Sequence, residues 1–262
     1  MLKKILHIQD KNAPLFWLGY VHFTLFIFLL AFFRFNDTLV MGINSTIKPM
    51  KFALSIGFFS WTMALILQYV EDIRKVKVYS WVAVICLSFE QFAITLQALR
   101  GVPSHFNKAD TFGIVLYALM GVFILTVTLW TGFMTFIFIK QKAYNVPLAV
   151  SLGIKIGLIY CVIFSLFGGY FSGLQGHTVG GSDGGEGLPF LNWSKLFGDL
   201  RVAHFFGIHS LQIIPLFACW IEKRVKISTS IKAVWLFSLV YVAFVAFTMW
   251  QGLMGVPFIH FS

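Results

Sequence analysis

Seven long apolar stretches run through the chain, and short polar segments separate them. A helix needs roughly 20 apolar residues to cross the hydrocarbon core of a bilayer, and each stretch is long enough. The pattern therefore predicts an all-α, seven-transmembrane-helix bundle that forms a single integral membrane domain over residues 1–262. The predicted helices cover about residues 14–34, 50–70, 78–99, 112–139, 147–173, 201–221 and 232–257.

The composition agrees with a protein embedded in lipid. Hydrophobic residues make up 58% of the chain and charged residues only 11%, too little charge for a soluble protein of this size. The lipid bilayer is thus the expected partner. The net charge of +10 does not indicate nucleic acid, because the excess cations lie in short segments between the apolar stretches.

The distribution of these cations predicts the topology. Lys and Arg are denser in the segments that lie on the same side as the N-terminus, and cytoplasmic loops carry the excess of such residues. We therefore expect the N-terminus in the cytoplasm and the C-terminus outside, in a bacterial cytoplasmic (inner) membrane. The cations on the inner side are Lys3, Lys4, Lys11, Arg74, Lys75, Lys77, Lys140, Lys142, Lys223, Arg224, Lys226 and Lys232.

Two matching segments indicate an internal repeat. Gln97-Ala98-Leu99-Arg100-Gly101-Val102-Pro103 resembles Gln251-Gly252-Leu253-Met254-Gly255-Val256-Pro257, and both end an apolar stretch. The starts of the second and sixth stretches also match at one offset, whereas the first and fifth show no comparable match. The pattern predicts a 3+1+3 parallel repeat, with half-repeats 14–103 and 147–257 and a linker helix 112–139. The matched pairs are Lys51 with Arg201, Ala53 with Ala203, Gly57 with Gly207 and Ser60 with Ser210.

A glycine-rich segment over residues 174–200 interrupts the second half on its outer side. Its glycines favour irregular backbone over helix or strand. We interpret the segment as a lid over a polar site, because five residues are interleaved with the glycines or follow them: His177, Asp183, Glu186, Trp193 and Asp199. A flexible linker is the alternative.

Glu90 is the candidate for proton chemistry in the first half. It lies near the middle of the third apolar stretch, where an ionisable group is costly and faces the bundle interior or a cavity. Gln97 lies on the same helix face and Arg100 one turn further on. The alternative is a structural carboxyl paired across helices.

Histidines provide the candidates in the second half. His204 and His209 are assigned catalytic roles with Glu90, and Gln212 shares a helix face with His209. Five residues turn a helix so far that His204 and His209 lie about 140° apart, which makes a shared metal difficult. Together with His22, they remain the candidate ligands for a metal or a b-type haem. Hydrogen-bonded packing histidines are the alternative.

Cations at helix starts suggest an anion site. Lys51 and Arg201 lie at outer N-terminal helix ends, where free N–H groups and the helix dipole favour negative charge. Snorkelling to lipid headgroups is the alternative. The complete predicted substrate-binding set is Lys51, Gln97, Arg100, His105, His177, Asp183, Asp199, Arg201, Gln212 and Gln251.

The combination of Ser104-His105-Phe106-Asn107, the run from His177 to Pro189, and the segment from Gly198 to Gln212 carries a resemblance. Over most of its length the chain resembles a family of bacterial polytopic membrane proteins. This resemblance implies the membrane fold and brings no activity with it.

Three functions fit these residues. The first is a proton-coupled transporter of a small anionic solute. The second is a membrane-embedded enzyme or redox protein that depends on a metal or b-haem, and the third is an accessory membrane subunit. No cofactor is firmly implied, and the pattern is compatible with a homo-oligomer.

Overall fold

The computed structural model describes residues 8–108, 110–141, 145–184 and 187–259. The chain divides into two compact units, Met1–Met134 and Thr135–Ser262, which are described one at a time. Seven of the described helices are long and apolar enough to cross a membrane by length and composition. This confirms the prediction of a mostly helical, multi-pass integral membrane protein.

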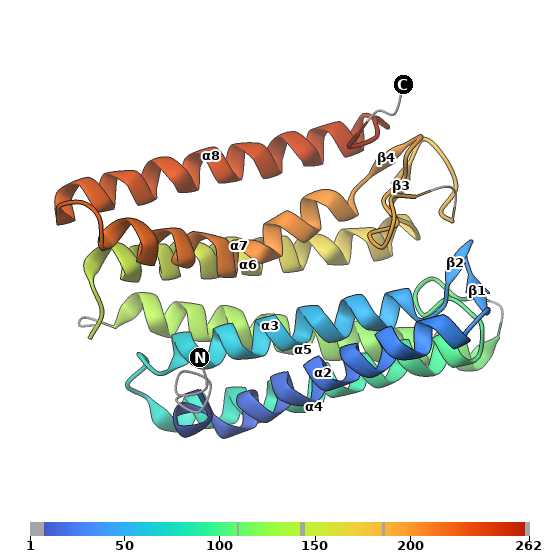
Figure 1. The fold of residues 1–262 in the computed structure, drawn as a ribbon, viewed down its shortest axis with the longest axis horizontal. Coiled ribbons are helices and arrows are strands. Elements are labelled where there is room, and N and C mark those ends of the chain that lie inside the picture. Colours follow the sequence, from blue (N-terminus) through green and yellow to red (C-terminus); the bar gives the residue numbers. More distant parts are fainter. Residues whose placement is uncertain (1–7, 109, 142–144, 185–186, 260–262) are drawn as a thin grey trace. The chain divides into compact units, whose positions relative to one another are not determined.

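Unit 1 contains three antiparallel helices, a small sheet, and most of a fourth helix (Figure 1). Asn12 starts the first helix by accepting a hydrogen bond from the Leu15 N–H, and its side-chain amide donates to Ser80 of the third. The fourth helix packs on the third through Leu116 and Met120. The elements are α2 (Ala13–Phe32), η1 (Phe33–Phe35), β1 (Leu39–Val40), β2 (Ile43–Asn44), α3 (Ile47–Leu67), α4 (Ile73–Leu99) and α5 (Thr111–Lys140).

Unit 2 repeats the order of helix, sheet, helix, helix (Figure 1). Its elements are α6 (Leu148–Leu174), β3 (Thr178–Val179), β4 (Gly198–Asp199), α7 (Arg201–Glu222) and α8 (Ile227–Leu253). The glycine-rich segment is therefore not wholly irregular, because β3 and β4 at its two ends pair as antiparallel strands. The sequence pattern missed them because each strand is only two residues long.

A glycine lets the first two helices of each unit approach closely. A Cβ at Gly57 of α3 would lie 2.7 Å from the ring of Phe23 on α2. A Cβ at Gly207 of α7 would lie 2.1 Å from the ring of Phe164 on α6. Each phenylalanine thus occupies the space that a side chain would need, and the two contacts correspond between the units.

These contacts identify a register for the first helices. When the sequence is aligned so that Phe23 matches Phe164, the segment Val21-His22-Phe23-Thr24-Leu25-Phe26 aligns with Val162-Ile163-Phe164-Ser165-Leu166-Phe167. Four of these six pairs are identical and one exchanges Thr for Ser. The sequence alone did not show this match, because seven apolar stretches allow many equally plausible registers.

The third helix of each unit ends in the same hydrogen-bond pattern. Gly101 (φ 70°) and Gly255 (φ 74°) adopt the left-handed conformation that favours glycine. The N–H of the residue after each glycine donates over 3.1 Å to the carbonyl of Gln97 or Gln251. This is the Schellman arrangement of a helix end. In addition, Gly101 lies against Thr38 beside β1, and Gly255 lies against Val179 of β3.

We predict that Gly207→Ala destabilises the chain by about 1–3 kcal/mol, because a methyl group there overlaps the Phe164 ring. Thermal unfolding of the purified chain in detergent measures the change. Gly169→Ala on α6 is the control, since a Cβ there meets nothing within 4 Å. It should be neutral or stabilising by up to about 1 kcal/mol. Equal losses from both substitutions would contradict the packing described.

Candidate functional site

A buried polar track follows α4 in unit 1. Glu90 and Gln91 are each 4% exposed and Gln97 is fully buried. One polar atom of each has no hydrogen-bond partner among the described residues, namely Oε1 of Glu90, Oε1 of Gln91 and Nε2 of Gln97. An unsatisfied buried polar atom costs on the order of 1–3 kcal/mol, so this track is an expensive feature that packing alone does not explain.

The N-terminus of α3 lies at the level of this track. The Gln91 amide donates to the carbonyl of Pro49, in the first turn of α3, over 3.3 Å. Gln91 is eight residues, or about 12 Å, from the end of α4. The first turn of α3 therefore lies beside the middle of α4, about two turns before the C-terminal end of α4. No side-chain hydrogen bond caps this helix start, and the positive end of the helix dipole there favours negative charge.

Two lysines accompany the helix start. The Lys48 ammonium acts electrostatically on the Glu90 carboxyl. Lys51, a predicted anion ligand, follows one turn later on the same helix face, and both lysines are half-buried. The structure thus joins Glu90 to Lys48, a residue that the sequence placed outside the candidate set.

Arg100 is held in an ion pair at the C-terminal end of α4. Its guanidinium lies 2.5 Å from Asp110 and donates to Gln97 over 2.7 Å, with the ring of Phe112 beneath it. The pKa of Asp110 is held below its ordinary value, mainly by the hydrogen bond from the Gly113 N–H and next by the one from Arg100. His105 packs against Phe52 and Tyr117 nearby.

Asp199 and Arg201 form an ion pair in unit 2, at the start of α7. The Asp199 side chain is fully buried, and its carboxylate lies 2.6 Å from the Arg201 guanidinium. The backbone N–H groups of Ser194 and Arg201 also donate to it, over 2.9 and 3.0 Å. Arg201 in turn donates to the carbonyl of Asn192. The predicted anion ligand therefore has its charge satisfied inside the loop.

The start of the glycine-rich segment joins this network. The His177 ring nitrogen Nδ1 lies 3.1 Å from Asp183 and 3.9 Å from Asp199. Asp183 also accepts a hydrogen bond from the Thr178 N–H over 2.9 Å. The Leu200 N–H donates to the carbonyl of His177 over 3.0 Å, which ties the two ends of the segment together. The described part of the loop is thus anchored, unlike a flexible linker.

Trp193 adds an apolar anchor. It is 5% exposed, and its ring packs against the rings of Phe205, Phe206 and Phe258. The sequence interpretation included Trp193 among the residues of the lid segment, but not its aromatic contacts.

The burial of Asp199 by itself would raise the pKa of its carboxyl. The hydrogen bonds and charge of Arg201, the His177 ring and the Ser194 N–H outweigh that effect and hold the pKa below its ordinary value. The ion pair therefore persists at all pH values above the ordinary range for Asp.

The three candidate histidines share one tautomer. The Nδ1 atoms of His22, His204 and His209 lie 2.6–2.7 Å from backbone carbonyls. A carbonyl oxygen only accepts, so each Nδ1 carries the hydrogen and each neutral ring keeps its lone pair at Nε2. Among the described residues, no three His, Cys, Asp or Glu side chains are arranged to hold a metal.

The remaining candidates make local contacts. The Gln251 amide donates to the carbonyl of Pro257 over 2.7 Å at the end of α8. Gln212 is half-buried on α7. His204 lies against Gly168 of α6, and its ring meets Phe171 edge-on.

No family model, curated protein or solved structure matches the chain.

We predict that Asp199 controls the anchoring of the loop with pH. The pKa of Asp199 is lower in the folded chain than in the unfolded chain, where it is about 3.9. The ionised carboxylate therefore stabilises the fold fully above about pH 3.9, and this stabilisation is lost as the pH falls through the lower pKa of the folded state. The Trp193 fluorescence, taken as the difference from a Trp193→Phe variant, should stay constant down to about pH 4 and change below it.

Asp199→Asn is the control for this titration. It should show the altered Trp193 fluorescence at neutral pH, because Arg201 then loses its buried carboxylate. A transition near neutral pH in the wild type, or an unaltered Asp199→Asn variant, would contradict the assignment.

Proposed function

We propose that the chain is a proton-coupled transporter of a small anionic solute. The observation that carries this proposal is Glu90, a 4% exposed carboxyl in the middle of a membrane helix whose Oε1 has no hydrogen-bond partner among the described residues. Intramembrane carboxyls of this kind characterise proton pathways. The electrostatic interaction of Glu90 with Lys48, at the start of α3, would couple the binding of the proton to that of the anion.

The coupling follows from competition for one positive site. While Glu90 carries its negative charge, it neutralises the Lys48 ammonium and the positive end of the α3 dipole. When Glu90 takes up a proton, that positive charge is available to an anion. Proton and anion therefore favour each other's binding, and by linkage the effect is reciprocal. With a monovalent anion, the proton and the anion cross together without net charge.

The anion ligands in this proposal are Lys48, Lys51 and the positive end of the α3 dipole, together with Gln91 and Gln97 of the α4 track. Arg100 and Arg201 have a different part, because each is already held by a carboxylate. Arg201 positions the anchored loop, which we propose is a lid. His105, His177, Asp183 and Gln251 belong to the surroundings of the helix ends. His209 and Gln212 are proposed as polar groups on the path in unit 2.

We also propose a parallel 3+1+3 repeat, which favours a transporter. The Gly57–Phe23 and Gly207–Phe164 contacts, the paired sheets and the matching helix ends all follow the same order in both units. Parallel repeats of this kind are known in transporters. The shared features are scaffold, whereas Glu90 belongs to unit 1 alone, since Phe244 occupies the equivalent position.

We propose that the N-terminus lies in the cytoplasm, the C-terminus outside, and the whole chain in a bacterial inner membrane. The support is the excess of Lys and Arg in the segments on the N-terminal side. Of those residues, Lys3, Lys4 and Lys142 lie outside the described residues.

A metal- or haem-dependent redox protein is the second candidate. The observation in its favour is the shared tautomer of His22, His204 and His209, because metal-binding histidines usually fix their other nitrogen on a carbonyl or carboxylate. A transporter accounts for the buried Glu90 as well, so we place it first.

We predict that Glu90→Gln abolishes proton-coupled uptake. In proteoliposomes with a trapped pH dye, inward gradients of lactate, phosphate and sulfate are imposed one at a time. The wild type should acidify the interior with at least one of them, and Glu90→Gln should reduce this rate at least about tenfold because it has no proton to carry. Glu222→Gln, at the end of α7, is the matched control and should retain the wild-type rate. Proton-coupled uptake that survives in Glu90→Gln contradicts the proposal.

A further inference from the structure

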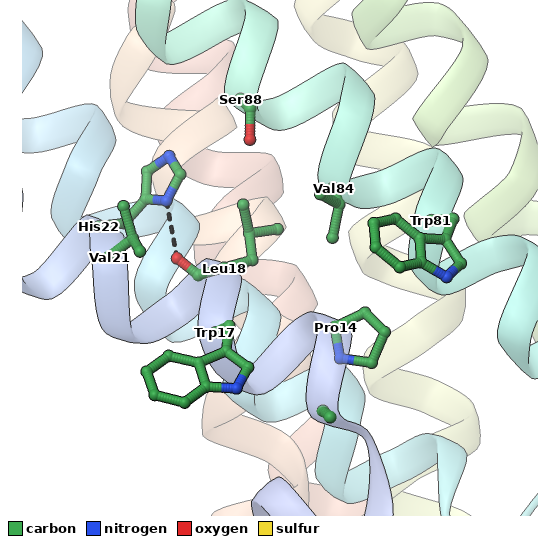
Figure 2. Close-up of a pocket in the computed structure, with 9 residues that line it drawn as sticks. Pro14, Trp17, Leu18, Val21, His22, Trp81, Val84 and Ser88 are labelled. Atoms are coloured by element: carbon green, nitrogen blue, oxygen red, sulfur yellow. Dashed lines mark hydrogen bonds between the residues drawn. The ribbon is translucent and has the colours of Figure 1, made fainter.

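A groove between α2 and α4 lies apart from the Glu90 track. It has a volume of about 380 Å³, within the lower part of the range for small-molecule sites. Its lining is almost wholly apolar (Figure 2). The lining residues are Ala13, Pro14, Trp17, Leu18, Val21, His22, Trp81, Val84 and Ser88.

The polar feature of the groove is His22. This residue is 3% exposed, and its Nε2 has no hydrogen-bond partner among the described residues. In Figure 2, the Nδ1 edge of the ring meets the Leu18 carbonyl, and the Nε2 edge is turned toward the helix that carries Ser88. A buried imidazole nitrogen without a hydrogen bond costs free energy unless a ligand donates a hydrogen bond to it.

The tautomer of His22 selects the ligand. Nδ1 lies 2.7 Å from the Leu18 carbonyl and must donate to it, so Nε2 of the neutral ring can only accept. A ketone, a quinone carbonyl or a carboxylate offers only lone pairs and cannot use it. A hydroxyl group can donate to Nε2. The Ser88 hydroxyl, exposed on the α4 wall, can serve a second polar atom.

The two tryptophans select the shape of the ligand. Trp17 on α2 and Trp81 on α4 flank the groove in Figure 2, and their side chains are 50% and 58% exposed. Indole faces prefer flat aromatic partners, and the apolar walls suit a body that partitions into lipid. A flat ring that carries a hydroxyl and an alkyl tail meets all of these conditions.

Comparison of the units separates the ligand-binding features from the scaffold. Trp81 aligns with Trp235 when the matching sequences at the ends of α4 and α8 are aligned, so both units have a tryptophan at this position. In contrast, Ile163 and Val242 occupy the positions equivalent to His22 and Ser88. The two polar groups of the groove are thus specific to unit 1. The equivalent helices of unit 2, α6 and α8, carry apolar residues at both positions.

We propose that the α2–α4 groove binds a membrane-soluble phenol or hydroquinone headgroup, whose hydroxyl donates to Nε2 of His22 while its ring lies between Trp17 and Trp81. The proposal concerns binding alone and is independent of proton-coupled transport.

Isothermal titration of the full chain in phosphatidylcholine nanodiscs tests this assignment. The probes are 4-nonylphenol and 4-nonylanisole, which differ only in that methylation removes the hydroxyl donor. The wild type should bind the phenol at least about tenfold more tightly, as expected for one buried hydrogen bond. Equal affinity for the two probes, or no binding of the phenol, overturns the proposal, and a bare acyl chain is then the better occupant.

Variants assign the preference to its atom. His22→Ile introduces the residue found at the equivalent position of unit 2 and should reduce the preference for the phenol to about onefold. Val21→Ala, elsewhere in the groove, should keep the preference while weakening both probes. A preference that survives in His22→Ile overturns the role of His22. If that variant fails to fold, the wild-type comparison of the two probes still decides.

A third probe tests the aromatic ring. 4-nonylcyclohexanol keeps the hydroxyl but is not flat, so it should bind at least about fivefold more weakly than the phenol. Binding as tight as that of the phenol overturns the aromatic assignment.

Discussion

A polar group buried among apolar side chains in a membrane protein has to find its partner inside the protein, because neither those side chains nor lipid offers one. The two units meet this constraint in opposite ways. In unit 2, the fully buried Asp199 is satisfied by Arg201 and by backbone N–H groups, and the result is an anchored loop. In unit 1, Glu90 and Gln97 keep polar atoms without a partner among the described residues, and we propose that a proton and a solute bind there.

Hydropathy was sufficient to predict the seven helices, because the need to bury apolar residues in lipid determines where each one lies. The predicted start of the second helix, residue 50, was late compared with the observed start at Ile47. Lys48 and Pro49 caused the error, since a charge and a proline look like a loop in a hydropathy pattern, yet both are tolerated in the first turn of a helix. The two-residue strands at either end of the glycine-rich segment were too short for any pattern to show.

The candidate site was only partly predictable. Glu90 could be found from its position in an apolar stretch, but its relation to Lys48 depends on the stagger of α3 against α4, which hydropathy does not encode. Likewise, Arg201 was recognisable as a cation at a helix start. That Asp199, two residues away, neutralises it follows only from the fold of the loop. The match between the first helices became visible only when the Gly207–Phe164 contact supplied the register.

The central claim is that Glu90 and an anion compete for the positive charge at the start of α3. Proton uptake on anion binding tests it most directly, measured with an indicator dye on the purified chain in weakly buffered detergent. At a pH at which Glu90 is ionised before the anion binds, the account predicts about one proton taken up per lactate, phosphate or sulfate bound by the wild type and none by Glu90→Gln. Anion binding without proton uptake in the wild type would contradict it.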